Sequence, residues 1–334
     1  MASSSSPHDA VFRLVLGEPA NAASQLRAVL PAGLVERLDL RRLTQVSGSF
    51  VDTELRWRHS DLLLTVPLDG REAFIYVLIE HQSNQDPLMP FRMLRYVTRI
   101  WDRYLSEHPA TTRLPAVIPL VVHHNRRPWT SSTQLLDLID LDAPAVDAVQ
   151  EYLPRFQFIL DDLARLDEQA LRARPVTPPV RLTLFLLKMA PGNPDLVQLL
   201  LPWLPDLRAI LDQPGGVTQF VALLSYIQTV GETPPDELHK LVAVVGPDAE
   251  EAYVTTAEML RAEGRAEGEA RGRAEGEARG EVRGRAEALV QLLTLKFGPL
   301  PQAVLATVRA ASTDQLQTWT ARVLSASTLD EVLG

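Results

Sequence analysis

Apolar positions follow two different periods in the first half of the chain. They recur at helical spacing from residue 8 to residue 45, and Pro31-Ala32-Gly33 interrupts that pattern. Two short apolar runs, 62–66 and 73–79, then flank Pro67-Leu68-Asp69-Gly70, which is a turn signal. The second run is rich in β-branched and aromatic residues, so we expect two strands joined as an antiparallel hairpin.

A third helix and two further strands are predicted after the hairpin. Residues 88–107 show helical periodicity, with four arginines inside an arc of about 80° at 100° per residue. Apolar residues cover the opposite side of this helix, namely Leu94, Val97, Trp101, Tyr104 and Leu105. The run 117–122 predicts a buried strand, and 156–160 predicts one more. The element order indicates an α/β domain.

The rest of the chain predicts helices. Residues 166–260 have proline-rich joints and no strand pattern, and residues 261–288 contain the octet Arg-Ala-Glu-Gly-Glu-Ala-Arg-Gly twice. Opposite charges at i,i+4 stabilise a helix by about 0.2–0.5 kcal/mol per pair, whereas each glycine costs about 1 kcal/mol. We therefore expect a marginal helix that acts as a spacer, with a close-packed oligomerisation helix as the alternative. Residues 289–334 predict a small helical module with a helix stop and restart at 297–301.

Composition narrows the class of protein. Hydrophobic residues make up 46% of the chain and charged residues 22%, as in ordinary globular proteins. Cysteine is absent, which excludes disulfides, thiolate catalysis and cysteine-based zinc sites, and fits a reducing cytoplasm. No apolar run is long enough to cross a membrane. Residues 1–7 have no features of a secretory signal and are expected to be a disordered tail. We expect a cytoplasmic protein without membrane contact.

The net charge of -9 is unevenly distributed. Residues 1–130 carry 15 Arg and Lys against 13 Asp and Glu, while residues 131–260 carry 8 against 19. Residues 261–334 carry 10 of each sign. The acidity therefore lies in the middle of the chain, and the first third is compatible with a phosphate backbone as partner.

Two carboxylates are predicted at the open end of the hairpin. Asp61 opens the first strand and Glu80 closes the second. With the turn centred on Gly70-Arg71, the numbers of paired residues add up to 141, so the two acids lie opposite each other. Gln82 points to the same face by strand alternation. Converging hard oxygen ligands suit Mg²⁺ or Mn²⁺, which activates water for attack on a phosphodiester. The alternative is a pair of polar strand ends at the surface.

Five short segments carry a recognisable pattern. They are His8-Asp9-Ala10-Val11-Phe12-Arg13, Ser49-Phe50-Val51, His59-Ser60-Asp61-Leu62-Leu63, Ile75-Tyr76-Val77-Leu78-Ile79-Glu80-His81-Gln82-Ser83 and Phe91-Arg92-Met93-Leu94-Arg95-Tyr96. Together they resemble the recombination-promoting nuclease (Rpn) family, often labelled transposase-like, of the PD-(D/E)XK nuclease superfamily. The resemblance covers about residues 7–260 and is dense up to about residue 125. The charged repeat and the helical tail resemble the module that often follows this domain.

The resemblance implies an α/β restriction-endonuclease-like core, which is a mixed sheet flanked by helices. A helical region, a long charged Gly-repeat helix and a small helical C-terminal module would follow this core. The chain then divides into a tail (1–7), a nuclease-like domain (8–165), a helical region (166–260), the repeat helix (261–288) and the C-terminal module (289–334).

The activity implied is divalent-metal-dependent endonucleolytic cleavage of DNA, linked to recombination or mobile elements. Asp61 and Glu80 match the metal carboxylates of the family, and the main-chain carbonyl of His81 would be a third ligand. Gln82 stands where the superfamily has the lysine of its (D/E)-x-K motif. Glutamine orients water but carries no charge. The alternative function is therefore a catalytically degenerate module that binds DNA or protein.

Other residues are candidates for the edges of the site. Asp9 is either an additional acid or the N-cap of the first helix. The arginine face and the end of the 117–122 strand are candidates for phosphate contact, with a solvated face as the alternative. These DNA-binding candidates are Arg92, Arg95, Arg99, Arg103, Arg126 and Arg127. His123 and His124 are adjacent on a strand and point to opposite faces, so we expect no shared metal. The expected partners are DNA and a second copy of the chain, bound through the C-terminal helices.

Overall fold

The computed structural model describes residues 6–46, 62–80, 85–125 and 127–334. The chain forms two compact units, Met1–Ala257 and Glu258–Gly334. Each unit is described by itself, and the boundary between them falls within a long helix, α12 (Pro247–Phe297). The tail expected at 1–7 lies for the most part outside the described residues. No helix in the described part of the chain is long and apolar enough to cross a membrane.

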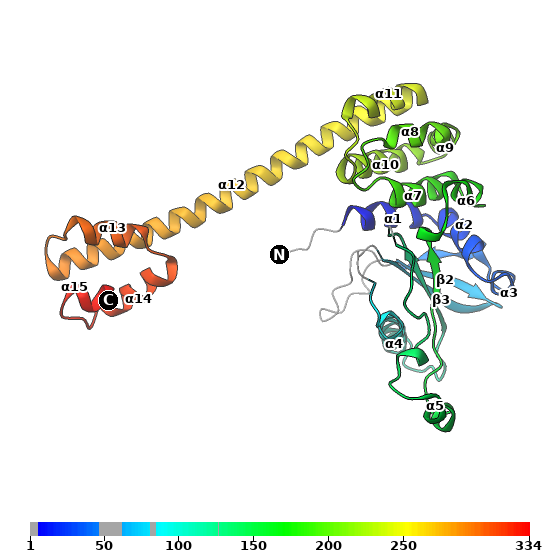
Figure 1. Cartoon of the computed structure of the whole chain (residues 1–334), viewed down its shortest axis with the longest axis horizontal. Coiled ribbons are helices and arrows are strands. Elements are labelled where there is room, and N and C mark those ends of the chain that lie inside the picture. The colour runs from blue at the N-terminus through cyan, green and yellow to red at the C-terminus, as the bar shows by residue number, and fades with distance from the viewer. Residues whose placement is uncertain (1–5, 47–61, 81–84, 126) are drawn as a thin grey trace. The chain divides into compact units, whose positions relative to one another are not determined.

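A five-stranded mixed sheet forms the centre of the first unit (Figure 1). Its strands lie side by side in chain order, with antiparallel pairing from β1 to β3 and parallel pairing from β3 to β5. The strands are β1 (Thr44–Gln45), β2 (Leu62–Leu68), β3 (Arg71–Glu80), β4 (Ala116–His123) and β5 (Ile159–Asp162). The prediction of a mixed α/β fold is confirmed, as are the strands expected at 62–66, 73–79 and 117–122.

The register of the β2–β3 hairpin differs from our expectation by two residues. Leu68 pairs with Arg71 and Leu62 with Val77, so the paired numbers add up to 139 and not 141. The turn is centred on Asp69-Gly70, whose φ angles of 49° and 77° are both positive. Two positive φ angles define the type I′ turn that favours Asp-Gly and matches the twist of a tight hairpin. Our placement of the turn at Gly70-Arg71 was therefore wrong.

The last strand begins later than the run 156–160 suggested. Gln157 bridges to Gln134, and the Phe158 amide donates to the carbonyl of Thr133. Gln157 and Phe158 therefore pair with Gln134 and Thr133 and not with β4. Pairing with β4 starts only at Ile159. Asp162 ends β5 and caps the next short 3-10 helix by accepting a hydrogen bond from the Ala164 amide.

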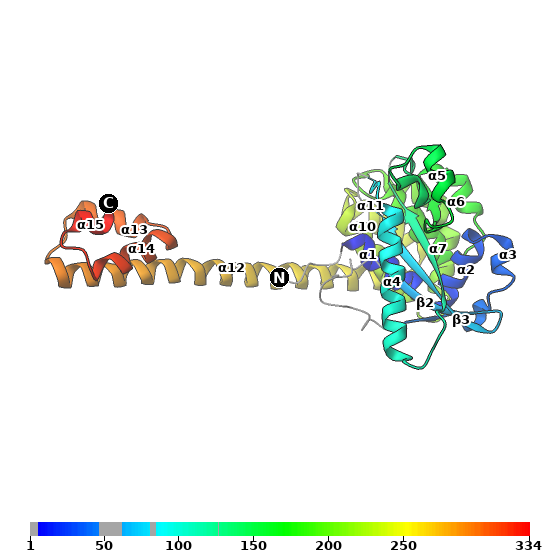
Figure 2. The ribbon, with the colours of Figure 1, turned by 90° about the horizontal axis from the view of Figure 1, so that it is seen from below.

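Helices cover both faces of the sheet, as the two-sided apolar character of β3 and β4 requires. On one face lies α4 (Figure 2). Its Met93 and Ile100 pack against a cluster that includes Tyr76, Leu78 and Val121. On the other face, α1, α2, α7 and α10 join the cluster of alternate strand residues. The helices of this unit are α1 (Pro7–Leu16), α2 (Pro19–Val29), α3 (Ala32–Val35), α4 (Met89–Glu107), α5 (Ala143–Val149), α6 (Glu168–Ala173), α7 (Pro178–Met189), α8 (Leu196–Leu200), α9 (Leu204–Leu211), α10 (Gly216–Val230) and α11 (Pro235–Val245).

The helical pattern at 8–45 is divided more finely than expected, into α1, α2 and α3. The break after Leu16 has a steric cause. A Cβ on Gly17 would lie 2.5 Å from the carbonyl oxygen of Arg13, so only glycine fits this close approach. Pro19 then starts α2 within its first two positions, where its missing amide costs no hydrogen bond.

The buried face of α4 is rotated from the one we expected. Met89, Met93, Val97 and Ile100 are buried, at the i, i+4, i+8 and i+11 spacing of one helix face. Leu105, which we placed on the apolar side, is 41% exposed. Its neighbour Tyr104 packs against the sheet-covering cluster, so Leu105, about 100° further round the helix, points away from it.

Residues 166–257 share their core with the sheet. The Phe12 side chain of α1 belongs to the same apolar cluster as Phe185 of α7 and Phe220 of α10. Trp203 is fully buried in that cluster and packs against Phe185 with ring centroids 4.4 Å apart. The helical region expected after residue 165 is therefore one layer of the first unit.

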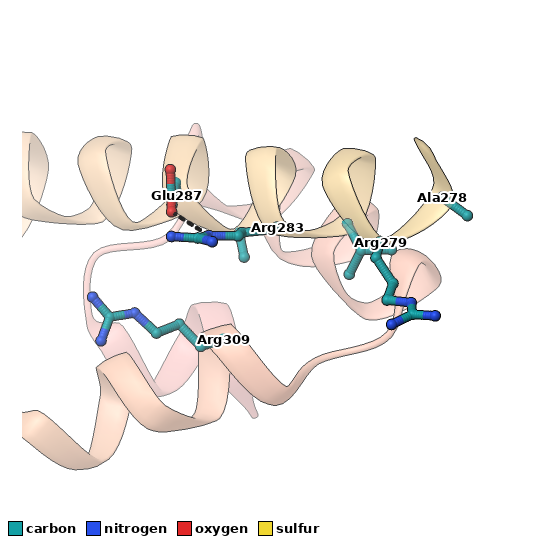
Figure 3. Close-up of a pocket in the computed structure, with 7 residues that line it drawn as sticks. Ala278, Arg279, Arg283, Glu287 and Arg309 are labelled. Carbon is teal, nitrogen blue, oxygen red and sulfur yellow. Dashed lines mark hydrogen bonds and ion pairs between the residues drawn. The ribbon is translucent and has the colours of Figure 1, made fainter. Parts of the chain in front are cut away.

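The second unit consists of the later part of α12 and three short helices, α13 (Gln302–Ala310), α14 (Thr313–Val323) and α15 (Leu329–Leu333). Leu289, Leu293 and Trp319 contribute to its small core. A groove between α12 and α13 contains Arg283, which pairs with Glu287 at 3.0 Å, and Arg309 lies across from them (Figure 3). The helix stop expected at 297–301 is confirmed by Gly298, whose φ is 84°.

The charged repeat is helical, as expected, and its glycines face open space. Apart from the helix's own backbone, no described atom lies within 4 Å of a Cβ built on Gly268, Gly272 or Gly276. These glycines therefore only lower the stability of the helix, because glycine loses more backbone entropy on folding than any other residue.

Replacing Gly268, Gly272 and Gly276 together by alanine should stabilise α12 by about 1 kcal/mol per site. The expected result is a stronger helical circular dichroism signal for the full chain and a higher melting temperature for this part of it. The matched control is Gly70→Ala at φ +77°, where the same change should destabilise by about 1 kcal/mol. A loss of helicity in the triple variant would contradict the prediction.

Candidate functional site

The structure describes few of the residues predicted to be catalytic. The backbone of Glu80 is described as the last residue of β3. Asp61, His81 and Gln82 lie outside the described residues, and so does Arg126. The site is therefore built here from the elements that surround Glu80.

The parallel strands end level with Glu80. Glu80 pairs with His123, the last residue of β4, and His123 pairs in turn with Asp162, the last residue of β5. In open sheets with parallel strands, ligands bind outside the carboxyl ends of the strands. The carboxyl ends of β3, β4 and β5 are therefore the place where a substrate would meet Glu80.

His123, the last residue of β4, and His124, which follows it, lie on opposite sides of the sheet, as strand alternation predicts. His123 is fully buried, donates from Nε2 to the carbonyl of Arg127 at 3.0 Å, and meets the Trp129 ring edge-on. His124 is 5% exposed, and its Nδ1 lies 3.2 Å from the carbonyl oxygen of Leu187 on α7. A carbonyl only accepts, so Nδ1 of His124 carries the proton and Nε2 is an acceptor in the neutral ring.

The start of α1 lies beside His124. The His8 ring is 5.1 Å from the His124 ring, and Nδ1 of His8 is 2.8 Å from the Tyr226 hydroxyl of α10. Burial raises the pKa of the Tyr226 hydroxyl, which keeps it neutral. Asp9 is 4% exposed in the first turn of α1, and the N-cap position belongs to Ser6. The alternative of Asp9 as an N-cap is therefore wrong, and a buried acid lies in the turn next to His8.

The predicted arginine face of α4 is partly occupied by neighbouring acids. Arg92 is 17% exposed in its side chain and lies 3.6 Å from Asp86. Arg103 donates to Glu107 at 2.7 Å. Arg95 and Arg127 are exposed. Ion pairing reduces the charge that an arginine offers to a phosphate. Arg95 and Arg127 are therefore better candidates for contact with DNA than Arg92 and Arg103.

Gln85 is a residue that sequence reasoning missed. Its Oε1 accepts from the amides of Thr130 at 2.8 Å and Ser131 at 3.2 Å, and its Nε2 donates to the carbonyl of Pro128 at 2.7 Å. These bonds join the segment after β3 to the loop after β4. No local sequence signal marks this role, since the partners are more than 40 positions away. Tyr226 was missed for the same reason.

The donor chemistry of the predicted site fits a hard divalent cation. Asp61, Glu80 and a main-chain carbonyl offer oxygen ligands, which Mg²⁺ prefers, and the rest of its shell is filled by water and phosphate. Among the described residues, no group of three His, Asp or Glu side chains is arranged to hold a metal. The part of the chain that the structure describes therefore offers no alternative to the predicted pair.

Relatives of this chain include nucleases and a protein described as inactive. It is 32% identical over 265 residues to recombination-promoting nuclease RpnA of Escherichia coli K12, covering 78% of this chain and 85% of the relative. It is 42% identical over 129 residues to RpnD of E. coli O157:H7, covering 38% of this chain and about half (49%) of that nuclease. It is 30% identical over 268 residues to the inactive recombination-promoting nuclease-like protein RpnE of E. coli K12, covering 79% and 84%.

No solved structure matches the chain. A family model described as "Putative transposase, YhgA-like" matches residues 6–216, which include the whole sheet and the helices α1, α4 and α7. That match covers more than half of the chain and agrees with the relatives found among the recombination-promoting nucleases. The chain therefore belongs to the YhgA-like transposase family, whose members include these nucleases.

Proposed function

We propose that this protein is a divalent-metal-dependent DNA endonuclease with a PD-(D/E)XK, restriction-endonuclease-like core, linked to recombination or mobile-element activity. The observation that carries the proposal is the level ending of β3 and β4, which places Glu80 at the carboxyl edge of the sheet. Asp61 and Glu80 are the metal-binding carboxylates in this proposal, and the carbonyl of His81 is a third ligand.

The arrangement of elements supports the proposal. A β2–β3 hairpin leads through the long helix α4 to the parallel strand β4, so a strand-borne acid lies beside a second, buried strand. A site mounted on paired strands is rigid, which preorganises its ligands for the transition state. RpnA, a relative that is named a nuclease, matches this chain over 78% of its length.

Each of the proposed site residues has a distinct role in this reaction. A bound Mg²⁺ or Mn²⁺ supplies Lewis-acid activation of the phosphodiester and of the attacking water. Asp61 and Glu80 hold the cation, Gln82 orients the water by a hydrogen bond, and Arg95 and Arg127 bind flanking phosphates. With a neutral Gln82, stabilisation of the transition state depends more on the metal than in enzymes that have a lysine there.

Purified protein should nick supercoiled plasmid only in the presence of Mg²⁺ or Mn²⁺, and chelation by EDTA should stop the reaction. The measurement is the initial rate of conversion from supercoiled to open-circular DNA. Ca²⁺ serves as the control cation, because it binds oxygen ligands with longer bonds and looser geometry. Cleavage at an equal rate in EDTA would overturn the metal-dependent mechanism.

A second candidate function is a catalytically degenerate module that binds DNA or a protein partner. It is favoured by the match to inactive RpnE, which extends over 79% of this chain. DNA binding measured by fluorescence anisotropy, with no cutting in any divalent cation, would support this second candidate.

A further inference from the structure

Two large apolar side chains are exposed at the start of α4. Leu88 is 55% exposed and Phe91 is 49% exposed, whereas Met89 and Met93 are buried on the other side of the helix. Leu88 and Phe91 are three positions apart, so they lie on one face and form a pair that we call the apolar tip of α4. Single exposed apolar side chains are ordinary, but contiguous ones mark surfaces that a partner covers.

Contacts along α4 place its apolar tip towards the end of β3 that carries Glu80. Near the C-terminal end of the helix, Tyr104 packs edge-on against Phe74, with ring centroids 6.2 Å apart. Two turns earlier in the helix, the Tyr96 ring lies 5.0 Å from the ring of Tyr76, which comes later on the strand. The helix therefore runs antiparallel to β3, and its first turn lies towards the carboxyl ends of the parallel strands.

Hydrogen bonds hold the backbone of the apolar tip in place. Gln85, three residues before Leu88, accepts from the amides of Thr130 at 2.8 Å and Ser131 at 3.2 Å, in the loop after β4. Asp86 accepts from the Leu88 amide at 2.9 Å. The tip is thus tied to the end of a second strand before the helix begins. A surface fixed in this way loses little conformational entropy when it binds a partner.

The charges around the apolar tip indicate DNA as its partner. Arg95 follows Phe91 by about one helical turn and is exposed, and Arg127 is exposed in the loop after β4. DNA offers the matching surface, because the apolar faces of its bases are bordered by phosphates. An uncharged apolar partner would cover the tip and leave both arginines without a counterpart.

We propose that Leu88 and Phe91 form a wedge that enters the DNA beside the cleaved phosphodiester and unstacks one base step. Phenylalanine and leucine are among the side chains that DNA-bending proteins insert between bases. This inference rests on the proposed function, because the DNA is the substrate of the nuclease. The wedge makes both residues determinants of specificity. Flexible pyrimidine–purine steps such as TA and CA are the easiest to unstack, so cleavage concentrates at them.

The test compares binding to two DNA duplexes of the same sequence, one intact and one with two adjacent mismatched base pairs. Fluorescence anisotropy in EDTA measures both affinities without any cutting. A mismatched step has already lost much of its stacking, so a wedge enters it at a lower cost in free energy. The full-length wild type should bind the mismatched duplex about 10-fold more tightly. In Phe91→Ala and in Leu88→Ala this ratio should fall towards 1.

Two further variants separate the wedge from general effects on the helix or on charge. Leu105→Ala is the matched control, because Leu105 is 41% exposed at the other end of the same helix, and its loss should leave the ratio unchanged. Arg95→Ala should weaken binding to both duplexes alike, as the loss of a phosphate contact does, and should also leave the ratio unchanged.

The outcomes distinguish the wedge from the nuclease activity. If Phe91→Ala and Leu88→Ala keep the preference for the mismatched duplex, the wedge is refuted even in an active nuclease. If they lose it in a protein that cuts with no divalent cation, the nuclease proposal fails and the wedge stands. A wild-type ratio of 1, together with a dimer that Phe91→Ala dissociates in sedimentation, would overturn the wedge and assign the tip to a second copy of the chain.

Discussion

Replacing Glu80 by glutamine, or Asp61 by asparagine, should lower the rate of metal-dependent plasmid nicking by about 100-fold or more. Each change keeps the size of the side chain and removes the charge that holds a divalent cation. Loss of a partner in the second shell of a metal site already reduces activity 10–100-fold, so loss of a ligand should cost at least as much. Initial nicking rates at saturating Mg²⁺ measure the effect.

The matched control for Glu80→Gln is Glu72→Gln. Glu72 lies on the same strand, near the turn at the opposite end of the hairpin, and is exposed. This variant should cut at the wild-type rate and melt at the wild-type temperature. If Glu80→Gln and Asp61→Asn cut as fast as Glu72→Gln, the reaction belongs to another site or to a contaminant.

Replacing Asp161 by asparagine should lower the free energy of unfolding of the first unit by about 3 kcal/mol. Asp161 on β5 accepts from Arg174 at 2.8 Å and from Gln25 at 2.7 Å, and the acid and the arginine are only 7% and 9% exposed in their side chains. Removing one charge of a buried pair leaves the other uncompensated, which destabilises a protein by about 3–5 kcal/mol. Urea denaturation followed by tryptophan fluorescence measures this loss, because Trp203 is buried in the same unit.

An exposed ion pair supplies the comparison for Asp161→Asn. Asp69 pairs with Arg37, and their side chains are 48% and 65% exposed. Water already solvates both charges, so Asp69→Asn should lower the free energy of unfolding far less than Asp161→Asn does. If the two variants lose similar amounts of unfolding free energy, the Asp161–Arg174 pair is less shielded from water than its exposed fractions of 7% and 9% indicate.

The hairpin shows how far local sequence rules extend. The β-branched run before Glu80 and the Asp-Gly turn signal were enough to predict both strands and their antiparallel pairing. The register was missed by two residues because it depends on which two residues adopt positive φ, and Asp69 as well as Gly70 does so. Steric tolerance of this conformation by aspartate is a local property, and giving it more weight would have corrected the prediction.

The arginine helix shows a different limit. The spacing of Arg92, Arg95, Arg99 and Arg103 was enough to place them on one face of α4. The pairing of Arg103 with Glu107 follows an i,i+4 rule that the sequence also displays. The proximity of Arg92 to Asp86 depends on how the chain enters α4, which no periodicity encodes.

The sequence by itself determined the elements and the family, because helical and strand periods, turn residues and short motifs are properties of neighbouring positions. It predicted the helix of the charged repeat, the α/β order of the first part of the chain, and the position of Glu80 at the end of a strand. Only the tertiary structure decided which distant groups meet. Tyr226 reaches His8 across 218 positions, and Gln25 reaches Asp161 across 136. Such contacts follow from the packing of whole layers on the sheet, which minimises exposed apolar surface and leaves buried polar groups to pair wherever they come together.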